Sequence, residues 1–482
     1  MYLGLDIGTS GVKALLIDEK QTTIATANGA LDVARPHTGW SEQNPDDWIK
    51  ATRKAIGSLK ENHGTQLALV KAIGLSGQMH GATLLDEADQ VLRPCILWND
   101  VRSHKEAAVL DDNPVFRKLT GNIVFPGFTA PKLVWVKNNE PEIFGKVAKV
   151  LLPKDYLRLW LCGEYVSDPS DASGTGWLDV ANRCWSEELL QACDMNIAQM
   201  PGICEGSAIS GTLRKELSQA WGMEANVVVA GGGGDNAASA VGMGVIEHGS
   251  AFVSLGTSGV IFAANQRYLP NPDSAVHAFC HALPDRWHQM GVILSATDAL
   301  NWFAGICGSN AEKLSRQLGS ELNRPGGVTF LPYLSGERTP HNDARIRGNF
   351  IGLSHDDNPL SLTQAVMEGV GFAFRDNINA LKAAGTSIDQ AIAVGGGANS
   401  IYWLKAIATI LNIPINVPVG GDLGAAFGAA RLGLLASENI DPSQICTPPA
   451  TASTIEPDKN LTHAFDEAYH KFTRSYPAIK GI

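Results

Sequence analysis

Positive charge is scarce in this sequence. Lysine and arginine number 38 against 49 aspartates and glutamates, and charged residues make up 18% of the chain, less than the ~25% typical of globular proteins. No stretch concentrates lysine or arginine. Nucleic acids and anionic membranes both require concentrated positive charge, so we expect neither as a partner. A small polar substrate fits this composition better.

Paired cysteines and long apolar runs are missing as well. None of the eight cysteines forms a Cys-x-x-Cys pair, which argues against a structural zinc site or a redox dithiol. The uncharged run Gly249–Gln266 is broken by the turn residues 256–259 and cannot span a membrane. Residues 1–6 have no positive charge beyond the terminus, and Asp6 interrupts any apolar signal core. We therefore expect a cytoplasmic location.

Glycine, by contrast, is abundant, with 50 residues in a chain of 482. At about 100 to 200 residues per domain, this length predicts two to four domains. The glycine content indicates many tight turns, which suits a compact enzyme rather than a disordered or coiled-coil chain.

A short repeat divides the chain into halves. Ile7–Val12 (Ile-Gly-Thr-Ser-Gly-Val) matches Leu255–Val260 (Leu-Gly-Thr-Ser-Gly-Val), and strand-like residues flank both copies. Each copy therefore predicts a hairpin, and the repeat predicts a duplicated domain. Glycines let backbone N–H groups converge on an anion, and the hydroxyls add donors, so two facing turns could hold one polyphosphate. A single Gly-Thr-Ser-Gly would be no more than an ordinary turn.

Polar residues follow the apolar strands of the first half. Asn44-Pro45 is typical of a helix start, with an asparagine N-cap and proline in the first turn. The buried-strand pattern Val70–Leu75 leads into the loop Ser76–Gly81, and another apolar run ends at Trp98–Arg102. Open α/β sheets bind ligands where their strands end, so these loops are candidate ligand contacts.

Two segments share a strand, a glycine turn and a helix. They are Asn226–Gly242, which contains Asp235 in the predicted N-cap region, and residues 391–410, which contain Gly395-Gly396-Gly397. Such turns present backbone donors at the beginning of a helix.

Taken together, these motifs resemble a known superfamily. Asp6-x-Gly8-Thr9-Ser10, Leu255–Ser258 and Gly395–Ala398 resemble the two phosphate loops and the adenosine loop of the actin, hexokinase and Hsp70 superfamily. Two longer stretches, Gly127–Asn139 and Gly348–Gly369, resemble the signatures of the FGGY carbohydrate kinases. The resemblance covers nearly the whole chain.

This resemblance implies an α/β fold of two RNase H-like domains with a cleft between them. We place the N-terminal domain at residues 1–243 and the C-terminal domain at 244–482, hinged near 243–250. Ser361 stands where the second signature expects an acid, an amide or histidine, but serine also caps helices well.

Four shorter segments resemble the bacterial D-xylulose kinases within that family. They are Gly77–Gly81, Trp98–Arg102, Leu152–Arg158 and Ser335–His341. Val101 replaces a glycine or glutamine common in that group, and the glycine run Gly231–Gly234 is one residue longer than usual. The longer run could shift the backbone of Asp235.

The family's catalytic aspartate corresponds to Asp235, which we expect to act as general base toward a sugar hydroxyl. From the sequence alone an ordinary helix cap would be the simpler interpretation. Asp6 is the expected ligand of a hydrated magnesium ion, because hard cations prefer oxygen ligands, and its simpler role is turn stabilisation.

The resemblance also assigns the binding residues. The expected phosphate contacts are Thr9, Ser10, Lys13, Gly256 and Thr257, and the expected adenosine contacts are Gly396, Gly397 and Asn399. Lys13 could equally be a solvated strand residue. The expected sugar contacts are Met79, His80, Asn99, Asp100, Arg102 and Asn236.

The sequence thus predicts an ATP- and Mg2+-dependent kinase that makes D-xylulose 5-phosphate. Related kinases for ribulose, gluconate or glycerol share the nucleotide motifs, and only Gln78–His80 and Trp98–Arg102 argue against them. An ATPase switch of the same superfamily, which needs no sugar, is the third alternative. The oligomeric state stays open, with a homodimer as one option.

Overall fold

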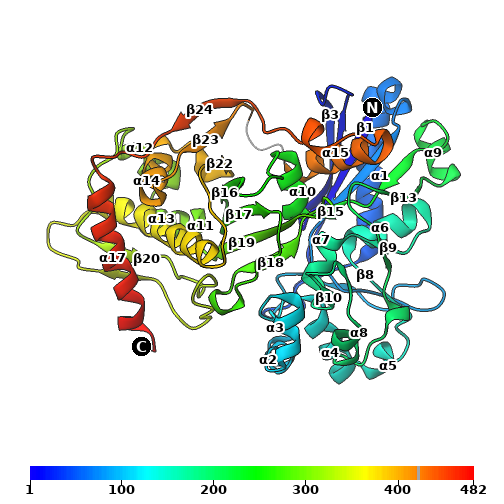
Figure 1. The fold of residues 1–482 in the computed structure, drawn as a ribbon, viewed down its shortest axis with the longest axis horizontal. Coiled ribbons are helices and arrows are strands. Elements are labelled where there is room, and N and C mark those ends of the chain that lie inside the picture. The colour runs from blue at the N-terminus through cyan, green and yellow to red at the C-terminus, as the bar shows by residue number, and fades with distance from the viewer. Residues whose placement is uncertain (421–423, 482) are drawn as a thin grey trace.

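Two seven-stranded sheets, one from each half, form the framework of the computed structural model, which describes residues 1–420 and 424–481 (Figure 1). The first has the order β13 (Ile209–Thr212), β14 (Val228–Ala230), β5 (Ala72–Gly77), β1 (Tyr2–Ile7), β2 (Gly11–Ile17) and β3 (Thr23–Ala30), with β15 (Gly233–Gly234) also paired to β5. The second has the order β24 (Thr451–Ile455), β23 (Ile415–Pro418), β22 (Ala391–Val394), β16 (Ala251–Leu255), β17 (Gly259–Asn265), β19 (Trp287–Ile293) and β18 (His277–Cys280).

The two sheets repeat one topology. In the first, β1 pairs antiparallel with β2 and parallel with β5, and β5 pairs parallel with β14. In the second, β16 has the same relations to β17 and β22, and β22 to β23. The two predicted hairpins are therefore confirmed as equivalent elements, β1/β2 and β16/β17. Strand β18 extends the second sheet beyond β19, whereas the first sheet ends at β3.

The two strand–glycine–helix segments recognised in the sequence do not occupy equivalent places. Strand β14 corresponds to β23, and β22 corresponds to β5, because β5 and β22 each lie beside the first strand of a hairpin. The loop Gly395–Ser400 is therefore the counterpart of the loop after β5, which contains Met79 and His80.

Helix α10 (Asp235–Gly242) and helix α15 (Gly424–Glu438) lie together between the two sheets. Although α15 comes late in the chain, it packs on β1 and β5 of the first sheet. The contact is close, because a Cβ added at Gly74 would lie 1.7 Å from the carbonyl oxygen of Ala429. A Cβ at Gly428 would lie equally close, 1.7 Å, to the carbonyl oxygen of Ala238 in α10. Only glycine permits this approach of backbones.

Helix α1 (Pro45–Ala68) packs on β2 and β3. The Asn44 side chain accepts a hydrogen bond from the Asp46 N–H, as expected for an N-cap. The apolar stripe of α1, which includes Trp48, Ile56 and Leu59, is buried. The predicted strand Val70–Leu75 is confirmed with a shift, since β5 runs from Ala72 to Gly77.

The remaining helices complete the two halves. Those of the first half are α2 (His104–Asp111), α3 (Pro114–Thr120), α4 (Thr129–Asn139), α5 (Pro141–Phe144), α6 (Pro153–Cys162), α7 (Pro169–Ala172), α8 (Glu187–Gln191) and α9 (Lys215–Trp221). Those of the second are α11 (Thr297–Ile306), α12 (Ala311–Gln317), α13 (Pro359–Ala383), α14 (Ile401–Leu411), α16 (Pro442–Ile445) and α17 (Thr462–Ile479). Within residues 1–420 and 424–481, no helix combines the length and the apolar character needed to cross a membrane.

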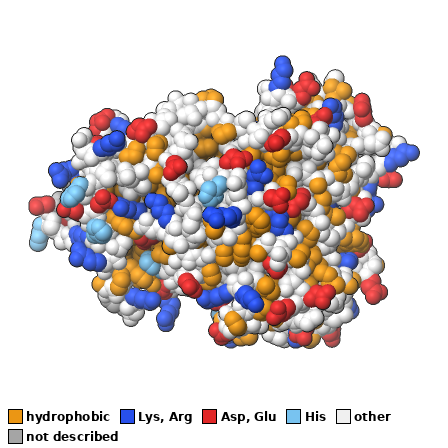
Figure 2. All heavy atoms as spheres, viewed as in Figure 1, with side chains coloured by type: hydrophobic (Ala, Val, Ile, Leu, Met, Phe, Trp, Pro, Cys, Tyr) orange, Lys and Arg blue, Asp and Glu red, His pale blue; other side chains and the backbone are white. Residues whose placement is uncertain are grey.

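In the part of the chain that the structure describes, five short strand pairs form two-stranded sheets separate from the two seven-stranded sheets. They are β4 (Glu42–Gln43) with β7 (Cys95–Ile96), β6 (Thr83–Leu85) with β8 (Lys149–Leu151), β9 (Val166–Ser167) with β12 (Gly202–Ile203), β10 (Leu178–Asp179) with β11 (Cys184–Trp185), and β20 (Thr329–Leu331) with β21 (Asn349–Ile351). On the face drawn in Figure 2, basic and acidic side chains are interspersed. Residues 243–250, where we expect the hinge, connect α10 to β16.

Candidate active site

Two acidic side chains come together at the ends of the first sheet's central strands. Asp6 on β1 lies between Lys13 on β2 and Ser76 on β5, and Ser76 in turn pairs with Gly233 of β15. The next residue after β15 is Asp235. The sheet register therefore brings the predicted metal ligand and the predicted base to one edge.

Asp235 is the first residue of α10 rather than its N-cap, which is Gly234. Its Oδ1 accepts hydrogen bonds from the backbone N–H of Asn236 at 2.7 Å and from the Asn236 Nδ2 at 2.9 Å. Burial, together with the nearby Asp6 charge, raises the pKa of Asp235 to about 7 against the effect of these hydrogen bonds. This carboxyl group can therefore take up and release a proton near neutral pH.

Asp6 is suited to a hydrated cation. Its Oδ1 is buried without a hydrogen-bond partner among the described residues, and burial raises its pKa while Ser76 and Lys13 act in the opposite direction. In residues 1–420 and 424–481, no group of three His, Cys, Asp or Glu side chains could hold a metal by itself. Magnesium commonly uses one or two carboxylates, water and substrate phosphates, so a single orphaned carboxylate oxygen fits it.

His80 is held in an unusual backbone conformation, with φ of +68°. Its carbonyl oxygen accepts hydrogen bonds from Thr129 Oγ1 at 3.0 Å and Lys132 Nζ at 2.9 Å. Burial is the main cause that lowers the pKa of His80 to about 3, and the Lys132 and Arg338 charges add to it. The ring is therefore neutral. Because Nδ1 lies 2.6 Å from the carbonyl oxygen of Gly174, Nδ1 carries the hydrogen and Nε2 can accept one from a hydroxyl.

Met79 connects His80 to the turn before Asp235. It is buried, and a Cβ added at Gly234 would lie 2.9 Å from its Cγ. The structure thus brings Met79, His80, Asp235 and Asn236, four of the predicted residues, into one neighbourhood.

The sequence analysis missed an aromatic and cationic wall beside His80. Phe128 stacks on the His80 ring with centroids 4.9 Å apart, and Arg338 lies over the Phe125 ring at 4.5 Å. Arg338 also contacts His277 of β18, with 3.3 Å between Nη1 and Nε2. The motif Ser335–His341 was recognised, but nothing in it indicated that Arg338 contacts residues far away in the sequence.

The loop Trp98–Arg102 divides into an exposed part and a buried part. Asn99 is exposed, and Trp98 is 49% exposed. Asp100 and Arg102 are buried and pair with each other, with 2.6 Å between Arg102 Nη2 and Asp100 Oδ2.

The polar atoms of this pair are occupied within the protein. The guanidinium group of Arg102 also pairs with Glu42 at 2.7 Å and stacks on Trp40 at 3.6 Å, and Asp100 accepts from the Ser41 N–H at 2.6 Å. These contacts favour a bracing role for Asp100 and Arg102 rather than direct contact with a sugar.

Thr9 links the first Gly-Thr-Ser-Gly turn to the loops 76–81 and 98–102, the two predicted sugar-binding loops. Its hydroxyl donates to Gln78 Oε1 at 2.9 Å and accepts from Trp98 Nε1 at 3.0 Å. Ser10 is exposed at the tip of the turn, and Lys13 is half-buried on β2. A ligand at this turn would therefore touch elements of both predicted sites.

The second turn adjoins a large pocket. The carbonyl oxygen of Gly256 accepts from the N–H and hydroxyl of Thr297, at 3.0 and 2.8 Å, and that of Thr257 accepts from the Ala296 N–H at 2.9 Å. Gly395 packs on the same turn, because a Cβ there would lie 2.8 Å from the Leu255 carbonyl carbon.

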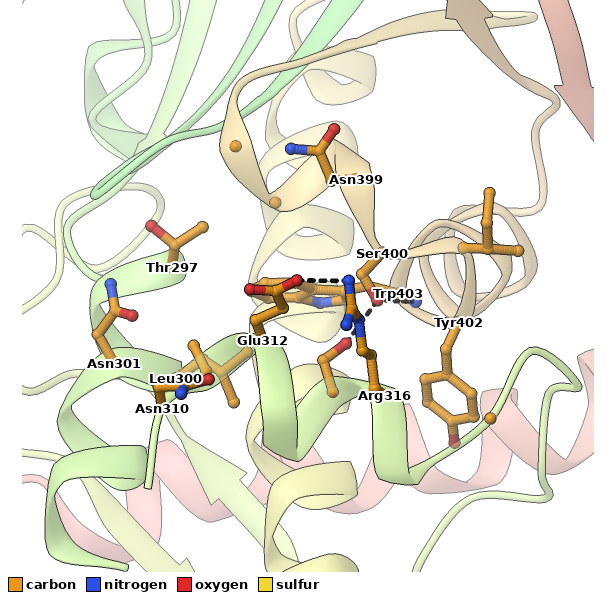
Figure 3. A pocket seen from close by; sticks show the side chains of 16 residues that line it. Thr297, Leu300, Asn301, Asn310, Glu312, Arg316, Asn399, Ser400, Tyr402 and Trp403 are labelled. Atoms are coloured by element: carbon orange, nitrogen blue, oxygen red, sulfur yellow. Dashed lines mark hydrogen bonds and ion pairs between the residues drawn. The ribbon is translucent and has the colours of Figure 1, made fainter. Parts of the chain in front are cut away.

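The adjoining pocket is a cavity of about 760 Å³ that contains the predicted residues Gly396, Gly397 and Asn399 (Figure 3). The remaining lining residues were not predicted; they include Thr297, Asn301, Asn310, Glu312, Arg316 and Tyr402. They come from α11, from α12 and its N-cap Asn310, and from α14, and their spacing in the sequence does not indicate that they lie together. Such a volume lies within the range of small-molecule and cofactor sites.

Known proteins identify the class that this fold and site define. The N-terminal domain of the FGGY family of carbohydrate kinases matches residues 1–242, and the C-terminal domain of that family matches residues 251–437. The chain belongs to the FGGY family of carbohydrate kinases, which confirms the resemblance and the sugar-kinase class expected from its motifs.

The chain is also similar to individual sugar kinases. A xylulose kinase from Escherichia coli K12 is 52% identical over 441 residues, which cover 91% of this chain and 90% of the relative. A crystal structure from Brucella ovis, described as a xyloylose kinase, is 64% identical with a TM-score of 0.99 and covers 99% of both chains. A glycerol kinase from Plasmodium falciparum with ADP is 18% identical with a TM-score of 0.89, over 98% of this chain and 97% of that chain. At that identity the likeness shows the fold alone.

Proposed function

We propose that this protein transfers the γ-phosphoryl group of ATP to D-xylulose, giving D-xylulose 5-phosphate and ADP. The observation that carries the proposal is the Asp235 carboxyl group, with a pKa of about 7, at the sheet edge next to Met79 and His80. The identities with xylulose kinases support D-xylulose as the acceptor.

Asp235 acts as the general base in this proposal. The proton of the sugar hydroxyl passes to the Asp235 carboxylate while that oxygen bonds to the γ-phosphorus, and the bond from the γ-phosphorus to the bridging oxygen of ADP breaks. Phosphoryl transfer asks the protein chiefly to align the reactants and to stabilise charge, and a positioned base contributes about 10²–10⁴-fold. Asn236 holds the carboxylate through two hydrogen bonds.

The acceptor is held by the loop after β5. His80 Nε2 accepts a sugar hydroxyl hydrogen, Met79 and Asn236 flank the sugar, and Asn99 with the exposed ring of Trp98 closes the site. Asp100 and Arg102 act indirectly, by bracing that second loop through their buried ion pair.

The nucleotide is bound by the second half and by both hairpin turns. Gly396, Gly397 and Asn399 contact adenosine in the pocket of Figure 3, and Thr9, Ser10, Lys13, Gly256 and Thr257 surround the phosphates. Asp6 would hold Mg2+ through water, and when bound the ion would neutralise charge on the phosphates.

A panel of acceptors tests this function. ADP release would be measured at saturating ATP with D-xylulose, ribulose, gluconate, glycerol or no acceptor, and the product would be examined by NMR for phosphate on the C5 oxygen. We expect kcat/KM for D-xylulose to exceed that for the other acceptors by at least about tenfold, since lost polar contacts are costly in a buried site.

A higher kcat/KM for gluconate, ribulose or glycerol would reassign the substrate within the family. ATP hydrolysis that proceeds at one rate with and without every acceptor would contradict the kinase proposal itself.

A further inference from the structure

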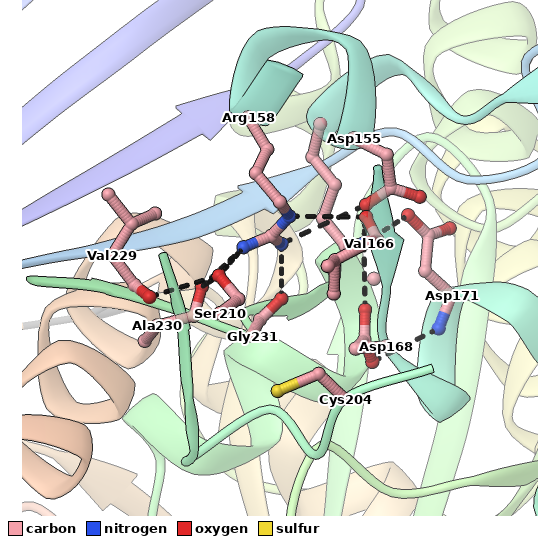
Figure 4. A network of polar contacts seen from close by, with 12 residues as sticks. Asp155, Arg158, Val166, Asp168, Asp171, Cys204, Ser210, Val229, Ala230 and Gly231 are labelled. Atoms are coloured by element: carbon pink, nitrogen blue, oxygen red, sulfur yellow. Dashed lines mark hydrogen bonds and ion pairs between the residues drawn. The ribbon is translucent and has the colours of Figure 1, made fainter. Parts of the chain in front are cut away.

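A fully buried charge cluster lies beneath the turn that carries Asp235 (Figure 4). At its centre, Lys154 Nζ lies 2.5 Å from Asp155, 2.8 Å from Asp168 and 3.3 Å from Asp171, and all four side chains are 0% exposed. Arg158, one helical turn after Lys154 on α6, lies 3.8 Å from Asp155. Isolated charges are expensive to bury, so a cluster of this size requires a physical explanation.

Three aspartates face two cations, Lys154 and Arg158, in this cluster. Burial raises the pKa of Asp171 well above its ordinary value, and the neighbouring Asp155 and Asp168 act in the same direction, whereas Lys154 opposes them. Lys154 contacts all three aspartates and Arg158 lies beside Asp155, so ion pairs join every charged member of the cluster.

The cluster reaches the glycine turn by two routes. Arg158 donates through Nη1 to the carbonyl oxygen of Ala230 at 2.6 Å and through Nη2 to that of Gly231. By the other route, Ser170 Oγ donates to Asp168 and accepts from the Gly234 N–H at 3.1 Å. These contacts hold the first and the last residue of the run Gly231–Gly234.

The turn itself has no side chain with which to anchor its backbone. Gly232 has a φ of +79°, and a Cβ there would lie 2.4 Å from the carbonyl oxygen of Leu75, so this position excludes side chains. Glycine also has the largest backbone freedom of any residue. Backbone hydrogen bonds to Ala208 and Gly206 and the pairing of β15 with β5 hold the run, and Arg158 and Ser170 add the side-chain contacts that fix its two ends.

We propose that the cluster of Lys154, Arg158, Asp155, Asp168 and Ser170 is a positioning element for Asp235, and that it acts through the hydrogen bond from the Gly234 N–H to Ser170. Gly234 directly precedes Asp235, so this bond fixes the point where the catalytic side chain leaves the turn. The inference rests on the proposed role of Asp235 as the base. A displacement of about 1 Å at a reacting group can cost on the order of 10² in rate.

The variant Ser170→Ala tests the inference without leaving a buried charge unpaired, as removal of Lys154 would. Its matched control is Thr409→Val in α14. Thr409 is also buried, and its hydroxyl also donates one hydrogen bond, to the Lys405 carbonyl, and accepts one backbone N–H, from Asp458. The kcat, the KM for D-xylulose, the KM for ATP and the thermal midpoint would be measured for both variants and for Asp235→Ala.

We expect Ser170→Ala to lower kcat about 10- to 100-fold while both KM values stay within about threefold, because the substrates still bind but the base is misplaced. Thr409→Val should lower the thermal midpoint by a similar amount and leave kcat unchanged. Ser170→Thr, which keeps the hydroxyl, should recover most of the kcat that Ser170→Ala loses.

The outcomes separate the two proposals. If Asp235→Ala abolishes turnover but Ser170→Ala keeps kcat within about threefold of wild type, the positioning role is wrong and the base stands. An equal loss of kcat in Thr409→Val would mean that reduced stability alone explains the effect, and would also overturn the positioning role. If Asp235→Ala retains near wild-type turnover, the base and the inference that rests on it both fall.

Discussion

The loops that follow β5 and β22 occupy the same place in the two halves, yet their residues and surroundings differ. The first contains Gln78, Met79 and His80, and the buried Met79 side chain packs against Gly234, next to Asp235. The second begins with three glycines and borders a cavity of about 760 Å³. One scaffold thus carries a loop with buried side chains, where we propose that the sugar binds, and a glycine-rich loop beside a large cavity, where we propose that the nucleotide binds.

The difference teaches how a duplicated fold acquires two functions. Topology determines where a ligand can bind, because the strand ends are equivalent in both sheets. The residue types in each loop then determine what binds there, since side chains occupy volume and provide hydrogen bonds whereas glycines leave volume and expose backbone.

Removal of the Asp235 carboxyl group should have the largest effect. We expect Asp235→Ala to lower kcat by at least about 10³-fold while the Kd for D-xylulose changes only a few-fold, because the base acts on the reaction rather than on binding. Steady-state kinetics and calorimetric titration with D-xylulose would measure both. Turnover near that of wild type would remove Asp235 from the mechanism.

Removing one polar side chain from each loop should affect the two substrates separately. We expect His80→Ala to raise the KM for D-xylulose about 10- to 100-fold with little change in the KM for ATP, because a buried hydrogen bond is lost. Asn399→Ala should do the reverse, raising the KM for ATP about threefold to tenfold. If either variant changed both KM values equally, the division of function between the halves would be wrong.

The contact between α15 and the first sheet should be sensitive to a single methyl group. Gly74→Ala places a Cβ 1.7 Å from the Ala429 carbonyl oxygen, so we expect a loss of about 1–3 kcal/mol or more in the free energy of unfolding. Gly57→Ala in α1 is the matched control, because nothing lies within 4 Å of the new Cβ, and it should stabilise by about 0.5–1 kcal/mol. Chemical denaturation would measure both, and equal effects would contradict the close packing.

The Asp235 carboxyl group should also determine how activity depends on pH. Because the base must be deprotonated and its pKa is about 7, kcat/KM should rise with pH through 7 and then level off. The Asp6 charge raises the pKa of the Asp235 carboxyl group, and the hydrogen bonds from Asn236 lower it. Lys13 in turn faces Asp6. A profile that is flat between pH 5 and 8 would contradict the assignment.

The same raised pKa makes Asp235 costly to stability. The folded state binds this proton more tightly than the unfolded state does, so its contribution is complete below pH ~4 and is lost as pH rises to 7. Asp235→Asn should therefore raise the thermal midpoint at pH 8 by about 1–4 °C. A lower midpoint in this variant would contradict the expectation.

Local sequence patterns predicted the elements that depend on neighbouring residues. The repeated Gly-Thr-Ser-Gly predicted both hairpins and the duplicated sheet, and the Asn44 cap and the buried stripe of α1 followed from spacing alone. Two of the candidate loops, after β5 and after β22, could be placed at strand ends for the same reason.

The contacts that complete the site depend on segments far apart in the chain. Nothing near Arg338 indicates that it reaches Phe125 and His277, and the pairing of Arg102 with Glu42 requires two strands to meet first. The placement of α15 on the first sheet likewise depends on glycines in both partners, Gly74 of β5 and Gly433 of α15. Periodicity and motif spacing do not indicate which residues far apart in the sequence come into contact.

A crystal structure with D-xylulose and a non-hydrolysable ATP analogue tests the division between the halves most directly. We expect the γ-phosphate to lie between the turns Gly8–Ser10 and Gly256–Ser258. We expect the C5 hydroxyl of the sugar to lie about 2.6–3.2 Å from an Asp235 carboxylate oxygen. Phosphates held by one turn alone, or a sugar whose C5 hydroxyl faces away from Asp235, would contradict it.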